Sequence, residues 1–129
     1  FNQATNELFE NGFFHNKDIE TIFRGVKNFL QAAEIVFMNS KSEKAKLTNS
    51  ILFRAIFAIF NEVVDKCLRN YSDFKVESIV NILDPISKIN FDGYTGTSNA
   101  TYSKVVSDMR KELNEYNKRY INLNSENIF

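Results

Sequence analysis

The sequence predicts an all-α protein, a bundle of four to five antiparallel helices joined by short loops. In two long stretches, residues 18–38 and 98–122, apolar residues recur at alternating steps of three and four, which gives a helix one apolar face. No stretch shows the two-residue alternation that is typical of a strand. One Pro and four Gly in 129 residues also argue against a turn-rich β fold.

The length of the chain fits one domain. A chain of 129 residues can bury a core without disulfides or metal, so we expect residues 1–129 to form a single helical domain. It begins with Phe1 instead of Met, and we therefore interpret the chain as a fragment of a longer polypeptide or a processed chain. Thirteen Phe and no Trp predict a core of rings that need no hydrogen-bond partner.

Charge and cysteine content restrict the function classes. The 16 basic and 16 acidic residues cancel, which disfavours nucleic-acid binding without excluding a local basic patch. One cysteine, Cys67, cannot form an internal disulfide, and with the single histidine, His15, it is too little for a zinc site. We expect no metal, no cofactor, a packed thiol at Cys67 and a reducing compartment, the cytoplasm.

Residues 2–10 can form a short helix that Gly12 would end. Asp18 or Asn16 suits the N-cap of the next helix, residues 18–38. The predicted core face of that helix consists of Ile19, Phe23, Val26, Leu30, Ala33 and Phe37, widened by Ile22, Phe29 and Val36.

The polar segment 39–46 predicts an exposed loop, and a third helix follows from about residue 48 to residue 70, capped by Thr48 or Ser50. A fourth helix is expected at residues 73–83, because the residue before Pro85 avoids the helical conformation.

After an irregular stretch, the last helix begins near Ser98 or Asn99 and runs to about residue 122. Its apolar seam has nearly the spacing of a coiled coil and contains Tyr102, Val106, Met109, Leu113, Tyr116, Tyr120 and Leu123. Tyrosine hydroxyls need a partner or an edge. We therefore interpret Tyr116 and Tyr120 as binding residues at a boundary, either with the rest of the polypeptide or with a second copy of the chain.

The most apolar stretch, residues 51–60, contains one charged residue, Arg54. A membrane-spanning helix needs about 20 apolar residues, whereas this run has ten and polar residues follow, so no membrane segment is expected. On one continuous helix, Arg54 belongs to a narrow polar stripe made of Ser50, Arg54, Ala58, Asn61, Asp65 and Arg69. Arg54 either reaches solvent from a crowded helix or binds an anion or partner in a groove between helices.

The segment "DGYTGTSN", residues 92–99, leads into a helix N-terminus, where backbone amides can bind anions. It lacks the lysine and the preceding strand of a P-loop. It is nevertheless the best candidate for a recognition loop, with Tyr94, Thr97 and Ser98 as candidate binding residues, and Ser98 also suits a helix cap.

The segments "LTNSILFRAIFAIFNEVV", "ILDPISKINFDGY" and the charged helix after them resemble the C-terminal helical region of bacterial DGQHR-domain proteins, which include DndB-like proteins of DNA phosphorothioation and defence systems. The resemblance covers about two thirds of the chain and centres on residues 51–64 and 88–93. The Asp-Gly-Gln-His-Arg motif is not in this sequence, and Phe91 stands where such proteins often have Trp. The resemblance thus implies an accessory domain whose catalytic or DNA-contacting motif lies elsewhere, and no functional residue carries over.

Our leading hypothesis is a non-catalytic accessory domain of an intracellular bacterial protein that mediates protein–protein or intramolecular docking, in a DNA-modification or defence system. The expected partner is the rest of the same polypeptide, another protein or a second copy of the chain. No catalytic residue is assigned.

Two alternatives remain open. The first is nucleic-acid binding through Arg54, Lys41, Lys44 and Lys46 together with the 92–99 loop. The second is a small hydrolase or nuclease in which the fold brings His15 and Arg54 together.

Overall fold

The computed structural model describes residues 12–117, with the side chains of residues 12–114. This part of the chain forms five α-helices: α2 (Ile19–Met38), α3 (Ser50–Ala58), α4 (Phe60–Tyr71), α5 (Val76–Leu83) and α6 (Asn99–Asn117). Two 3₁₀-helices, η2 (Asp84–Lys88) and η3 (Phe91–Gly93), lie between α5 and α6. The described residues contain no strand, and the predicted all-α bundle is confirmed. The helix predicted at residues 2–10 lies outside the described residues.

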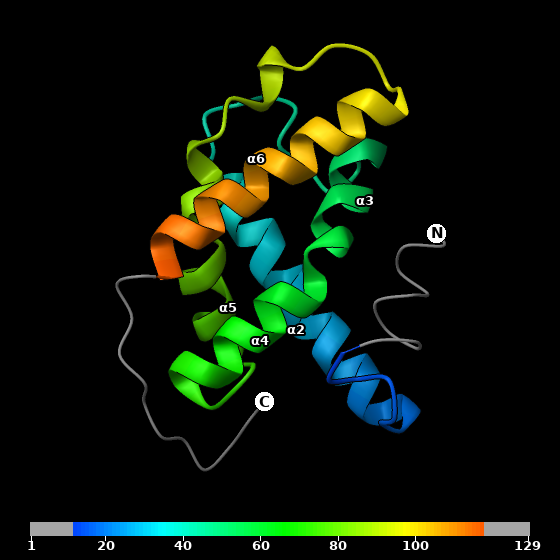
Figure 1. The fold of residues 1–129 in the computed structure, drawn as a ribbon, viewed down its shortest axis with the longest axis vertical. Coiled ribbons are helices and arrows are strands. Elements are labelled where there is room, and N and C mark those ends of the chain that lie inside the picture. The colour runs from blue at the N-terminus through cyan, green and yellow to red at the C-terminus, as the bar shows by residue number, and fades with distance from the viewer. Residues whose placement is uncertain (1–11, 118–129) are drawn as a thin grey trace.

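The helices pack in pairs. α2 packs most extensively against α5, α3 packs against α6, and α4 also packs against α5. Figure 1 shows α6 running diagonally across one face of the bundle, with its N-terminal half beside α3. The loops at residues 39–49 and 88–98 meet at the end of the bundle where α3 and α6 begin.

α2 begins as the sequence predicts, but its core face differs from the prediction. Oδ1 of Asp18 accepts a hydrogen bond from the amide of Thr21 at 2.8 Å, which caps the helix. The predicted core residues Ile19 and Phe23 are 81% and 64% exposed. Periodicity identifies the apolar side of a helix but not how far along that side a neighbour extends. The N-terminal end of α2 projects beyond the other labelled helices (Figure 1), so these two residues stay uncovered.

The predicted third helix is two helices in the structure. α3 ends at Ala58, α4 begins at Phe60, and Ile59 between them has φ −102° and ψ 8°. No Gly or Pro marks this break in the sequence. The cap of α3 is Asn49, not Thr48 or Ser50, and its Oδ1 accepts from the amides of Ile51 and Leu52 at 3.0 and 3.2 Å.

The break places the ring of Phe60 at the centre of a phenylalanine cluster. Its centroid lies 4.9 to 6.0 Å from four other rings, those of Phe14, Phe29, Phe57 and Phe74. Those rings come from the turn before α2, from α2, from α3 and from the segment before α5. Tilted and edge-to-face ring pairs are more favourable than their buried area alone. Tertiary packing of this kind explains a helix break for which the local sequence contains no signal.

Arg110 of α6 connects that helix to the same break. Its Nε lies 3.0 Å from both carboxylate oxygens of Glu62, in the first turn of α4, and its Nη2 donates to the carbonyl of Ala58 at 3.4 Å. Both side chains are about half exposed, so the ion pair adds little stability by itself. The contacts of Arg110 with Glu62 and Ala58 fix how α6 crosses the break between α3 and α4.

The later boundaries follow the prediction more closely. α5 ends at Leu83, just before Pro85, as predicted, although it begins at Val76 and not at Asp73. The Asp73 carboxylate accepts from the amide of Lys75 at 3.1 Å instead. α6 begins at Asn99, and Oγ of Ser98 accepts from the amide of Thr101 at 3.3 Å, which is the predicted cap.

Gly25 lies where α2 passes the Phe14 ring, and we expect Gly25→Ala to destabilise the protein. An added Cβ would fall within 3.0 Å of Phe14 Cζ and Cε1, closer than Cβ contacts in real proteins. Alanine normally stabilises a helix by about 1 kcal/mol relative to glycine. Here the overpacking should lower the free energy of unfolding by about 1–3 kcal/mol. Urea unfolding measures the difference.

Gly93→Ala is the matched control, because its Cβ would meet only the Asn90 side chain, at ordinary distances of 3.5 and 3.8 Å. Adding Phe14→Leu to Gly25→Ala should remove the clash and recover part of the loss. If Gly25→Ala were as stable as the wild type, the close approach of α2 to Phe14 would be wrong.

Candidate functional site

Hydrogen bonds join the loops at residues 39–49 and 88–98, and we call this contact the loop junction. The carboxylate of Asp92 accepts from the amides of Glu43 and Lys44, both at 3.0 Å. Oγ of Ser42 accepts from the amide of Phe91 at 2.9 Å and lies 3.4 Å from the carbonyl of Ile89. Two loops almost fifty residues apart in the sequence are therefore held in one arrangement.

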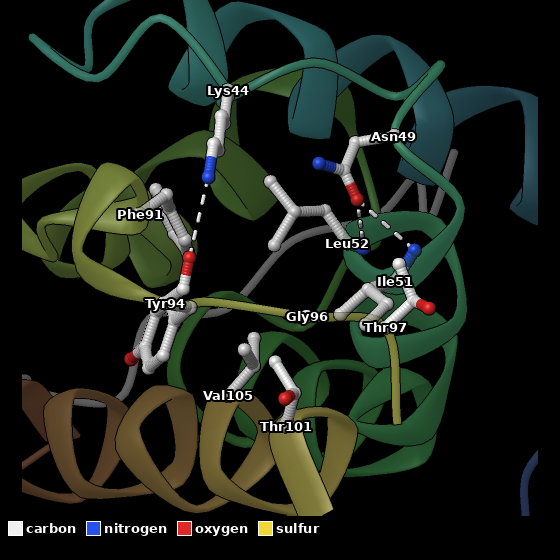
Figure 2. Close-up of a pocket in the computed structure, with 10 residues that line it drawn as sticks. All are labelled: Lys44, Asn49, Ile51, Leu52, Phe91, Tyr94, Gly96, Thr97, Thr101 and Val105. Atoms are coloured by element: carbon white, nitrogen blue, oxygen red, sulfur yellow. Dashed lines mark hydrogen bonds between the residues drawn. The ribbon is translucent and has the colours of Figure 1, made fainter. Parts of the chain in front are cut away.

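A cavity of about 310 Å³, which we call the junction cavity, lies beside the loop junction. Ten residues line it and are drawn in Figure 2: Lys44, Asn49, Ile51, Leu52, Phe91, Tyr94, Gly96, Thr97, Thr101 and Val105. Leu52, Phe91 and Val105 are buried and give it an apolar floor. Both α3 and α6 begin at its rim.

Two polar side chains that line the junction cavity, Lys44 and Asn49, retain hydrogen-bond donors. Nζ of Lys44 donates to the carbonyl of Tyr94 at 3.2 Å and retains further protons. Oδ1 of Asn49 caps α3, which leaves the amide NH₂ of Asn49 as a donor. The hydroxyl of Thr101 donates to the carbonyl of Thr95 at 2.8 Å. None of the ten lining residues is acidic.

Tyr94 is anchored to α6 and is half-buried. Its hydroxyl donates a hydrogen bond to the carboxylate of Asp108, and its ring packs on Phe91 with centroids 6.4 Å apart. Partial burial, together with the hydrogen bond and the charge of Asp108, raises the pKa of Tyr94 well above its usual value. The phenol therefore acts as a structural donor at neutral pH.

The structure brings only part of the candidate binding residues together. Tyr94 and Thr97 line the junction cavity, and Ser98 caps α6 beside it. Arg54 is not among the residues that line that cavity. Its guanidinium carbon instead lies 4.3 Å from the centroid of the Tyr102 ring on α6. Tyr116 and Tyr120 lie outside the residues whose side chains are described.

Arg54 of α3 is half-buried and makes a cation–π contact, which is worth about 0.5–1 kcal/mol at an accessible position. The polar stripe predicted for a single helix is divided by the break at Ile59. Ala58, which belonged to that stripe, is 6% exposed. The partner of the arginine is thus an aromatic ring of α6.

Sequence reasoning missed Asn49 and Thr101 as lining residues. Asn49 stands two residues before the start of the apolar run 51–60, and its cap preference was a usable signal. Thr101 carries no such signal, because only the return of the 92–99 loop onto α3 places it at the cavity.

The other candidate chemical groups are placed as follows. Cys67 is fully buried, and burial raises the pKa of its thiol, which makes it an unreactive core residue. His15 is exposed in the turn before α2. Among residues 12–117, no three His, Cys, Asp or Glu side chains are grouped so as to hold a metal ion. No helix in this same range is long and apolar enough to cross a bilayer.

Comparison with family models, curated proteins and solved structures found no match to this chain. Nothing in that comparison bears on the resemblance to DGQHR-domain proteins.

The loop junction should loosen when the Asp92 carboxylate is removed. In Asp92→Ala the amides of Glu43 and Lys44 lose their acceptor, so both should exchange with deuterium faster. Because the side chain is exposed, we expect the free energy of unfolding to fall by only about 1 kcal/mol. Amide exchange followed by NMR measures the local effect.

Asp84→Ala is the control, since Asp84 is also exposed and its carboxylate accepts no hydrogen bond in the described structure. Unchanged exchange at Glu43 and Lys44 in Asp92→Ala would contradict the loop junction.

The raised pKa of Tyr94 predicts a pH-dependent contribution to stability. Because the pKa is higher in the folded state than in the unfolded state, the contribution is complete below about pH 10 and is lost as the pH rises above it. At pH 7, Tyr94→Phe should lower the free energy of unfolding by about 0.5–1.5 kcal/mol. The gap between wild type and variant should narrow above pH 10, as measured by urea unfolding from pH 7 to 11. A gap that is constant over this range would refute the assignment.

Proposed function

We propose that this chain is a non-catalytic helical domain that docks against another protein segment, either the rest of its own polypeptide or a protein partner, including a second copy of itself. One observation carries the proposal: the N-terminal half of α2 exposes two large apolar side chains, Ile19 at 81% and Phe23 at 64%. Large exposed apolar groups that lie together on one helix face commonly mark an interaction site.

Ile19 and Phe23 continue a seam that is buried farther along α2. At about 100° per residue, both lie within about 40° of Phe37 around the helix axis. Phe37 is 3% exposed, and Val26 and Leu30 between them are half-buried. A partner that covered Ile19 and Phe23 would bury their apolar surface, which favours association by about 25 cal/mol for each Å² removed from water.

Charged residues flank this apolar face. Glu20, Arg24 and Lys27 are on the adjacent side of α2, and all three are exposed. An apolar centre with a rim of mixed charge is typical of protein interfaces and not of a phosphate-binding surface. This supports a protein partner.

The described contacts do not support the hydrolase or nuclease alternative. The segment that carries His15 packs against α4 through the rings of Phe14 and Phe60, whereas Arg54 contacts Tyr102 of α6. No described interaction joins His15 to Arg54, and Cys67 is buried and protonated.

One observation favours the nucleic-acid alternative in part. The loop that carries Lys41, Lys44 and Lys46, all exposed, is hydrogen-bonded to the 92–99 loop. Glu43 and Asp92 lie among these lysines, and Arg54 packs on a ring away from them. Nucleic-acid binding therefore stays a second prediction. A role in a bacterial DNA-modification or defence system, and a cytoplasmic location, also stay predictions.

Light scattering of the double variant Ile19→Ser/Phe23→Ser tests the proposal. We expect the wild-type chain to associate as its concentration rises and the double variant to remain monomeric. Its urea midpoint should be nearly unchanged, because both side chains are already exposed. Met38→Ser is the matched control, since Met38 is 77% exposed at the other end of α2. Around the helix it lies about 100° from Ile19 and about 60° from Phe23.

A wild-type chain that stays strictly monomeric, and that also fails to bind any region encoded upstream of it in the same reading frame, would overturn the proposal. Equal loss of association in Met38→Ser would show that the effect is not specific to the Ile19 and Phe23 face.

A further inference from the structure

We propose that the junction cavity binds a small organic anion, a carboxylate that carries a short apolar chain. This ligand site is separate from the proposed docking face, which lies at the opposite end of α2 from the 39–49 loop. The proposal rests on the size of the cavity, its apolar floor and the chemistry of the groups at its rim.

The cavity has the dimensions and the floor that a small ligand needs. Its volume of about 310 Å³ lies at the lower end of the range of about 300–1,000 Å³ that is usual for ligand pockets. The floor residues Leu52, Phe91 and Val105 are 3%, 1% and 0% exposed, and they come from α3, η3 and α6. An apolar chain placed on this floor would displace water from apolar surface.

The rim selects for negative charge. Lys44 is the cationic residue among the ten that line the cavity, and none of the ten is acidic. Its ammonium donates one hydrogen bond to the Tyr94 carbonyl and keeps two protons for other acceptors. Two carboxylates that contact lining residues already accept protein hydrogen bonds: Asp92 from two backbone amides, one of them that of Lys44, and Asp108 from the Tyr94 hydroxyl.

Asn49 supplies a donor whose direction is fixed. Its Oδ1 accepts from the amides of Ile51 and Leu52, so the opposite orientation of the side chain would set its NH₂ against two N–H groups. Figure 2 shows the amide nitrogen on the cavity side, facing the same space as Lys44. The hydroxyl of Thr97 makes no hydrogen bond in the described structure and lies at the same rim.

These groups together favour a monoanion over other ligands. A cationic ligand would meet Lys44 with no carboxylate among the lining residues to balance it. A single ammonium with neutral donors suits one carboxylate, and the positive ends of α3 and α6 at the rim act in the same direction. A bare anion would leave the apolar floor uncovered, so the ligand needs an apolar chain.

Titration of the ¹⁵N-labelled protein with sodium octanoate tests the proposal. We expect saturable shifts of the amides of Ile51, Gly96 and Thr97. Octylamine, with the same chain and the opposite charge, should bind at least tenfold more weakly, and sodium acetate should cause no saturable shift. Equal binding of octanoate and octylamine would overturn the proposal, and so would shifts confined to Ile19 and Phe23.

Two variants and a control locate the ligand. Lys44→Gln should weaken octanoate binding about two- to fivefold, as expected for a solvent-accessible ion pair. Thr97→Phe should abolish it by filling the cavity, and no hydrogen bond of the described structure is lost. Lys46→Gln, on the same loop but lining a different hollow, should bind as the wild type does. If all three variants bound octanoate equally, the junction cavity would not be the site.

Discussion

The break at Ile59 is the constraint on which the rest of the structure depends. A straight helix would already place Phe57 and Phe60 on one face, because they are three residues apart. What the break adds is a change of direction: α3 packs against α6, and α4 packs against α5. Both rings still belong to one cluster with residues from the turn before α2, from α2 and from the segment before α5. The break gives up regular helix geometry at one residue. This cost is offset by burial, because Ile59 and Phe60 are fully buried and the ring of Phe60 contacts four other rings.

The position of α6 depends on the same break and on the loop junction. Arg110 spans the bend by contacting Ala58 of α3 and Glu62 of α4, while Arg54 packs on Tyr102 nearer the start of α6. Tyr94 holds the preceding loop to Asp108 of the same helix. None of these contacts is strong alone, because each is partly exposed. Together they determine the spacing between the starts of α3 and α6, which is the space that the junction cavity occupies.

The two proposed surfaces differ in chemistry and in the way they arise. The docking face of α2 exists because an apolar seam extends beyond the helices that cover it, so its character is already present in the spacing of Ile19 and Phe23. The junction cavity has no counterpart in the linear sequence. Lys44 and Asn49 come from one loop, Thr97 from the other and Val105 from α6, and they meet only because Asp92 and Ser42 join the two loops.

Helical class, the caps at Asp18 and Ser98 and the stop before Pro85 were predictable, because each depends on residues within one turn of itself. Tyr94 and Thr97 were also found as candidates, since a polar glycine-containing loop before a helix is a local signal. The break at Ile59, the exposure of Ile19 and Phe23 and the ring partner of Arg54 were not predictable. Each depends on which distant segment lies opposite, and packing across the fold overrides periodicity along the chain.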